Sequence, residues 1–129
     1  MIFDSDILIW VFRRDAQAIG FLESQTTRLA SIITLMEVLA GARSKAELAT
    51  TRSFFVEFGI ELIPMSVSIS YAAANLIEEH ALTDGLDITD ALIAATARET
   101  GATLATANYR HFKNIPNLML HRFHPSRRT

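Results

Sequence analysis

Residues 85–108, "GLDITDALIAATARETGATLATAN", contain the pattern that decides the fold class. From Asp87 onward the stretch is rich in alanine and leucine and apolar on nearly every side until Arg98, which predicts a helix buried at the centre of the protein. Gly101 is a typical helix stop, and residues 102–108 follow as a short strand. A buried helix followed at once by a strand is typical of α/β proteins.

The same alternation continues on both sides of this stretch. The opening "MIFDSDILIW" (residues 1–10) predicts a strand that ends near Asp4 and a helix that starts at Asp6. Thr34 and Glu37 match the capping box S/T-x-x-E, so we expect another helix to start at Thr34. Further helices are predicted over residues 15–25, 45–59 and 66–82, and further strands over residues 28–33, 60–65 and 118–123. We therefore predict a three-layer α/β/α fold with a central, mainly parallel sheet.

Length and composition indicate one soluble globular domain over residues 1–129, with a polar, basic tail over about 122–129. No apolar run reaches the roughly 18 residues that span a bilayer, and no signal segment precedes the first strand, so we expect a cytoplasmic protein that does not bind membranes. The chain has no cysteine. Any bound metal must therefore be held by oxygen or imidazole ligands, which makes carboxylate chemistry the expectation.

The net charge of −2 hides an uneven distribution along the chain. All 14 acids lie in residues 1–99, whereas residues 100–129 carry five Lys/Arg and three histidines but no acid. Such an asymmetry indicates either a nucleic-acid contact surface or a solvated basic tail. The overall acidity argues against tight non-specific binding of nucleic acid, which depends on many contacts from Lys and Arg to phosphates.

Several polar residues lie at predicted junctions where a strand or loop meets the next element. Asp4, Glu37, Asp90 and Asn108 share this placement. In open α/β sheets, ligands bind at the carboxyl ends of the strands, so residues far apart in sequence can converge there. Clustered carboxylates repel one another unless a cation neutralises them, and hard oxygen ligands favour Mg²⁺ or Mn²⁺.

Each acid also has a simpler structural explanation. Asp6 suits a helix N-cap, Glu37 completes the capping box, and Asp87 favours the positive end of a helix dipole. Asp4 follows an apolar strand at a position where the predicted helix start needs no cap. Asp90 heads an apolar helix, where an uncompensated charge is costly.

The ordered segments "MIFDSDILIW", "ASIITLMEVLAGAR", "GLDITDALIAATARETGATLATAN" and "YRHFKNIPNLML" resemble those of PIN-domain proteins, and among them the VapC toxins of type II toxin-antitoxin systems. "TDALIAATA" followed by "LATANYRHF" is the most specific part of the match. The resemblance implies a PIN fold and a Mg²⁺-dependent endoribonuclease that hydrolyses RNA phosphodiesters. It also implies a homodimer, a cognate antitoxin that blocks the site, and contact with DNA only through that antitoxin.

The resemblance further assigns site residues. It places the three family acids on Asp4, Glu37 and Asp90, as catalytic and metal-binding residues. The fourth position, often aspartate in the family, is Asn108, which removes a charge and weakens any second metal site.

Five further residues complete the candidate site as support or substrate contacts. Asp6 supports the site and also caps a helix, and Asp87 adds a compensating charge or caps a turn. Thr106 hydrogen-bonds the carboxylates, while Arg110 and His111 contact RNA phosphate or belong to a solvated loop.

Two alternatives remain from the sequence. A haloacid-dehalogenase-type phosphatase shares the apolar strand followed by D-x-D, but it needs a lysine before its second acidic motif, and only Lys45 and Lys113 exist. A PIN-like domain that binds RNA or protein without cleaving is suggested by Asn108. The retained acids at the three other positions argue against that reading.

Overall fold

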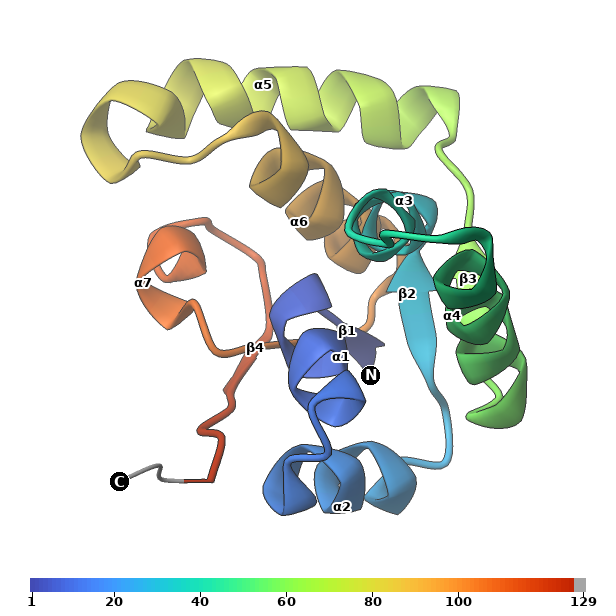
Figure 1. Ribbon diagram of the computed structural model, residues 1–129. Coiled ribbons are helices and arrows are strands. Elements are labelled where there is room, and N and C mark those ends of the chain that lie inside the picture. Colours follow the sequence, from blue (N-terminus) through green and yellow to red (C-terminus); the bar gives the residue numbers. More distant parts are fainter. Residues whose placement is uncertain (127–129) are drawn as a thin grey trace.

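The computed structural model describes residues 1–126, which form alternating strands and helices (Figure 1). The strands are β1 (Ile2–Phe3), β2 (Leu29–Ser31), β3 (Glu61–Ile63), β4 (Leu104–Thr106) and β5 (Leu120–Arg122). The helices are α1 (Ser5–Phe12), α2 (Ala16–Ser24), α3 (Ile32–Ala40), α4 (Lys45–Glu57), α5 (Val67–Asp84), α6 (Ile88–Thr100) and α7 (Tyr109–Phe112). The predicted α/β class is confirmed.

The strands form one sheet in the order β3-β2-β1-β4-β5, and every neighbouring pair is parallel. The prediction was a mainly parallel sheet. The chain builds outward from β1 through β2 to β3 and then returns to add β4 on the other side of β1. The carboxyl ends of β1 and β4 therefore meet where the direction of strand addition reverses, the usual place for a ligand site in an open α/β sheet.

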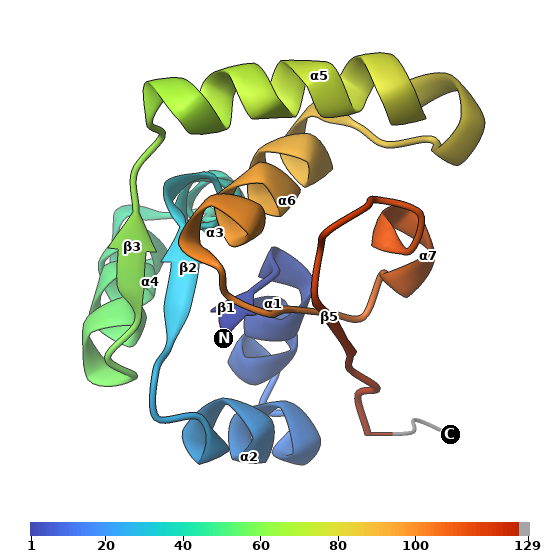
Figure 2. The same cartoon turned by 180° about the vertical axis from the view of Figure 1, so that it is seen from behind.

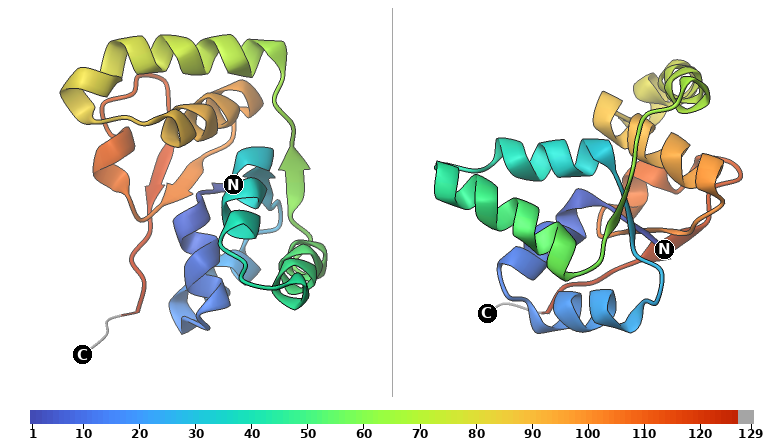
Figure 3. Two further views of the ribbon diagram at one scale, coloured as in Figure 1. Left: turned by 45° about the horizontal axis from the view of Figure 1, so that its top comes forward. Right: turned by 90° about the vertical axis from the view of Figure 1, so that its right-hand side faces the viewer.

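Helices cover both faces of the sheet, each over its own apolar core (Figures 1 and 2). Helices α5, α6 and α7 pack on one face, and α1 to α4 contribute to the core on the other. Alternate residues of each strand supply the two cores: Ile2 and Leu104 face α6, whereas Phe3 and Ala105 face α1. Figure 3 shows α5 lying along the outside of α6.

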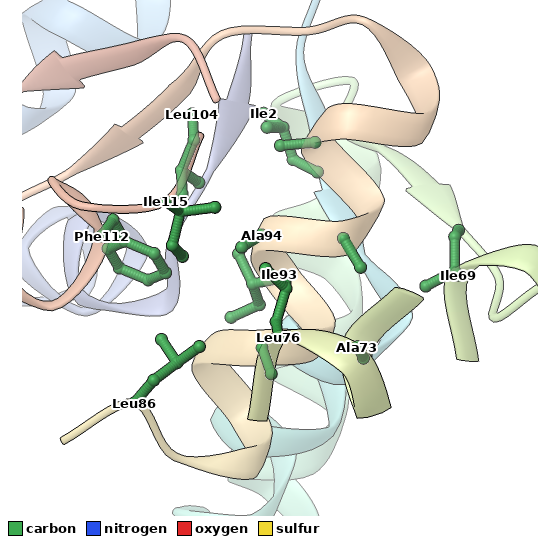
Figure 4. Close-up of a cluster of buried hydrophobic side chains, with 13 residues drawn as sticks. Ile2, Ile69, Ala73, Leu76, Leu86, Ile93, Ala94, Leu104, Phe112 and Ile115 are labelled. Atoms are coloured by element: carbon green, nitrogen blue, oxygen red, sulfur yellow. The ribbon is translucent and has the colours of Figure 1, made fainter. Parts of the chain in front are cut away.

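Helix α6 is the central helix of this arrangement, as its composition predicted. Its residues from Ala91 to Ala97 are buried except for the half-buried Leu92. Figure 4 shows Ile93 and Leu76 side by side in the core beneath α5. Asp87 caps the helix by accepting a hydrogen bond from the Asp90 amide at 2.8 Å, and Gly101 ends it in the left-handed conformation (φ 70°).

Two predicted helix starts are wrong, one by a single residue and the other by two. Helix α1 begins at Ser5, and its N-cap is Asp4, whose carboxylate accepts from the Ser5 amide at 2.8 Å; Asp6 lies in the first turn. Helix α3 begins at Ile32 with Ser31 as its N-cap, so Thr34 and Glu37 form no capping box. In both cases the strand ends earlier than expected, and the last polar residue of that strand or junction caps the helix directly.

The predicted basic tail over residues 122–129 falls on two parts of the chain. Arg122 ends β5, Phe123 is buried, and the Ser126 amide donates to Asp15 at 3.0 Å. The remaining residues, 127–129, lie outside the described part. Within residues 1–126, none of the helices is both long and apolar enough to cross a membrane.

Candidate active site

The carboxyl ends of β1 and β4 bring Asp4 and Thr106 together. The Thr106 hydroxyl donates to Asp4 Oδ2 at 2.7 Å across 102 positions of sequence, and both side chains are buried. The same hydroxyl accepts from the backbone N–H of Asn108 at 2.9 Å. The carboxylate of Asp4 is therefore fixed at both oxygens, by Thr106 on one and by the α1 amide of Ser5 on the other.

Asp6 lies two residues after Asp4, in the first turn of α1. Its Oδ2 accepts from the Ala107 amide at 3.0 Å, which links α1 to the segment after β4. Its Oδ1 is buried and has no hydrogen-bond partner among the described residues. An unpaired buried carboxylate oxygen is costly and is the kind of group that a bound cation or water satisfies.

Asp90 enters the same region from the first turn of α6. The ring Nδ1 of His111, on α7, lies 3.0 Å from Asp90 Oδ2. Asp87 caps the helix three residues earlier, so its predicted capping role is confirmed. The predicted contact of His111 with RNA phosphate stays a prediction; in the structure its ring, 33 % exposed, lies against the carboxylate of Asp90, which is 12 % exposed.

Glu37, Asn108 and Arg110 are exposed around this centre. Glu37 lies on α3, close enough for its charge to act on Asp90. Asn108 precedes α7, and its side chain makes no capping bond, so its side-chain amide group remains available to a ligand. The candidate residues thus come from the ends of β1 and β4 and from α1, α3, α6 and α7.

Burial and mutual repulsion raise the pKa values of the acids. Burial, followed by the charge of Asp6, raises the pKa of Asp4 to about 8, and the charge of Asp90 adds to the effect. Burial, followed by the charge of Asp87, raises the pKa of Asp90 to about 6, with a contribution from Glu37. Burial also raises the pKa of Asp6. These mutual effects place the acids in one electrostatic cluster, which bound positive charge would stabilise.

A divalent cation fits the chemistry of this donor set. Among residues 1–126, no three His, Asp or Glu side chains lie close enough together to form a ready-made metal cluster. Mg²⁺, however, needs only one or two protein carboxylates, because water and substrate phosphate complete its shell. Asp4 and Asp90 offer such carboxylates, and the unpaired Oδ1 of Asp6 lies buried beside them.

Thr34 is a buried polar residue of α3 whose hydroxyl has no partner among the described residues. Sequence reasoning treated it as a helix cap.

The contact between His111 and Asp90 could not be predicted from the sequence, because it depends on how α7 folds back onto α6. The sequence hinted at the contact between Thr106 and Asp4 only in that each residue lies at the predicted end of a strand.

Comparison with known proteins gives a consistent result. A PIN domain family model matches residues 1–118. Ribonuclease VapC19 of Mycobacterium tuberculosis is 37% identical over 90 residues, covering 69% of this chain and 70% of that protein.

Solved structures agree in fold. A toxin-antitoxin complex from Klebsiella pneumoniae contains a chain with 31% identity and a TM-score of 0.77, covering 92% of this chain and 94% of that one. VapBC2 from Rickettsia felis, bound to a DNA fragment from its promoter, gives 27% identity and a TM-score of 0.76, covering 96% and 100%. The phosphatase alternative has no support in these matches. The chain belongs to the PIN-domain family and, within it, to the VapC ribonuclease toxins of type II toxin-antitoxin systems.

Proposed function

We propose that this ribonuclease is a Mg²⁺-dependent endonuclease whose site lies at the carboxyl ends of β1 and β4. The observation that carries the proposal is the buried Asp4 carboxylate, fixed by Thr106 and lying within the electrostatic reach of Asp90. Asp4 and Asp90 hold the metal, and Glu37 binds it or positions the attacking water. When bound, Mg²⁺ or Mn²⁺ supplies positive charge that polarises the phosphodiester.

The chain's own groups prepare the site for that role. Thr106 holds one oxygen of Asp4, and His111 holds one oxygen of Asp90, so each carboxylate keeps a defined orientation. Asp6 ties the segment after β4 to α1 and leaves a second oxygen free. Asn108 completes the site through its side-chain oxygen or amide, and Arg110, beside it on α7, contacts RNA phosphate.

The test is cleavage of cellular RNA by the purified protein in Mg²⁺ and in EDTA. We expect Asp4→Asn and Asp90→Asn each to lower activity by roughly 100-fold or more, and EDTA to abolish it. Glu78→Gln, which removes an exposed carboxylate from α5, is the matched control and should retain activity. Cleavage that persists in EDTA and in both site variants would refute the mechanism.

We propose that a cognate antitoxin covers this site from the groove between α1, α3 and α4. The groove is lined by both apolar and charged residues, among them Ile9, Phe12, Arg13, Glu37, Val38 and Thr51. Because Glu37 belongs both to the groove and to the acidic cluster, a peptide in the groove reaches the site. The similar chains from Klebsiella pneumoniae and Rickettsia felis were solved as toxin-antitoxin assemblies, which supports a hetero-oligomer of this kind.

Two further parts of the proposal concern assembly and location. The toxin forms a homodimer through α5 and α6, which share a groove lined by Ala74, Ile88 and Ala91 and on which Tyr71 and Ile88 are exposed. Sedimentation velocity of the toxin alone tests this, since a monomer at micromolar concentration contradicts it.

The protein acts in the cytoplasm on cellular RNA and meets DNA only through its antitoxin, as the promoter-bound Rickettsia felis assembly suggests.

A further inference from the structure

Three adjacent strands present a row of polar side chains at the carboxyl edge of the sheet. In this parallel sheet Phe3 pairs with Ala105, and Thr106 pairs with Arg122. Residues that pair in register point to the same face, so Arg122 shares the face of Thr106 and hence of Asp4, which Thr106 contacts. At an interstrand spacing of about 4.8 Å, the backbone of Arg122 lies about 10 Å from that of Asp4.

The guanidinium group of Arg122 rests on an aromatic ring beside the site. Its central carbon lies 5.2 Å from the ring centroid of Tyr109, a cation-π distance. Tyr109 is the first residue of α7 and directly follows Asn108. The half-buried ring thus orients a charged group next to a residue already in the candidate site.

The guanidinium group of Arg122 is available to bind an anionic ligand. It is exposed, and within the described part of the chain no carboxylate lies at ion-pair distance from it. Arg28 differs clearly, because its guanidinium donates to the carbonyl oxygens of Gln25, Phe58 and Glu23 and so is used in the fold. Arg122 is a cation that the fold orients but does not neutralise.

These features suit a nucleotide of single-stranded RNA. Guanidinium groups bind phosphate through paired donors and also stack on bases, and aromatic side chains support such stacking. No acid occurs in residues 100–129, so nothing in that part of the sequence opposes an anionic ligand. We propose that Arg122, held by Tyr109, forms a subsite for a nucleotide adjacent to the cleaved phosphodiester.

The inference rests on the proposed ribonuclease site, and binding without cleavage tests it directly. The probe is a fluorescent, short, single-stranded RNA of random sequence, titrated with the full chain in EDTA and followed by anisotropy. We expect Arg122→Gln to weaken binding roughly 5- to 20-fold and to reduce the salt slope of log K by about 0.7, the loss of one phosphate contact. Arg52→Gln, which removes an exposed arginine from α4, should change affinity less than about twofold.

A second pair of variants separates positioning from folding. Tyr109→Phe keeps the ring under the guanidinium and should bind like the unmodified protein, whereas Tyr109→Leu should lose part of the affinity. With Mg²⁺, Arg122→Gln should raise KM and leave kcat within about twofold, since the subsite binds substrate without touching the reacting atoms. A purely structural role would lower thermal stability without changing the salt slope.

The outcomes distinguish this proposal from the proposed function. The subsite is refuted if Arg122→Gln and Arg52→Gln match in affinity and salt slope, or if the unmodified chain binds no RNA. RNA binding that depends on Arg122 but never leads to cleavage in Mg²⁺ would instead refute the nuclease mechanism and leave the subsite standing.

Discussion

Asp4 combines a structural role with the chemical role that we propose for it. It caps α1 through one oxygen and accepts the Thr106 hydroxyl through the other, yet it lies buried among acids that repel its charge. A residue that served only as a cap would be better exposed, where its charge costs little. The sequence identified Asp4 because it follows an apolar strand, but the local pattern could not reveal the hydroxyl of Thr106, which a distant strand supplies.

The raised pKa of Asp4 predicts that the metal-free protein loses stability as pH rises. The pKa of Asp4 is about 8 in the folded state and 3.8 ordinarily, so the folded state binds the proton more tightly. The protonated carboxyl therefore contributes its full stabilisation of the fold below a pH of 3.8. This stabilisation is lost as pH rises through the upper value, with a slope of up to about 1.4 kcal/mol per pH unit. Thermal unfolding in EDTA over this range measures the effect. Asp4→Asn should flatten the dependence, and a flat profile for the unmodified protein contradicts the prediction.

Thr106 should matter to both stability and site geometry. Thr106→Val keeps the shape but leaves the buried Asp4 Oδ2 without its donor and the Asn108 amide without its acceptor. We expect a loss of about 1–3 kcal/mol in the free energy of unfolding, measured by urea titration in EDTA. Thr106→Ser, which keeps the hydroxyl, should lose less than half as much. Equal losses in the two variants would mean that packing, and not the hydrogen bonds, accounts for the effect.

At the scale of elements, the type of each element could be predicted but some boundaries could not. Helix α6 carries its own signals, Asp87 at the start, alanines inside and Gly101 at the end, and was predicted closely. The start of α3 was not, because Ser31 and Thr34 are both good caps by residue type. The choice depends on where β2 ends, which its pairing with β1 and β3 decides.

The start of α3 can be tested by two substitutions. Ser31→Ala removes the side chain that accepts from the Ile33 amide and should cost about 1 kcal/mol. Thr34→Val replaces a buried hydroxyl without a partner in the described chain, so it should be neutral or stabilising. Denaturant midpoints of the two variants give the comparison. If Thr34→Val were the more harmful change, the capping box would be the correct description.

At the scale of the whole molecule, topology brings the site together. The return of the chain to β4 beside β1 juxtaposes Asp4 with Thr106, while α6 and α7 carry Asp90 and His111 to the same edge. The order of the motifs along the chain was enough to predict the PIN-domain family. The contacts between them follow from helix packing, which no local pattern encodes.

The groove that includes Glu37 yields a prediction for the proposed binding of an antitoxin. Ile9 is an apolar residue of this groove with 38% of its surface exposed, so a partner would bury it. Ile9→Gln places a polar group in that contact and should weaken antitoxin binding by about 10-fold or more, measured by calorimetry with the cognate antitoxin. Val56→Gln, at an apolar position of α4 that is 81% exposed and outside the groove, is the matched control.

Because Ile9 holds no metal or substrate, RNA cleavage by free Ile9→Gln should stay within about threefold of normal. Full inhibition of Ile9→Gln at the usual antitoxin concentration would show that the antitoxin reaches the site by another route.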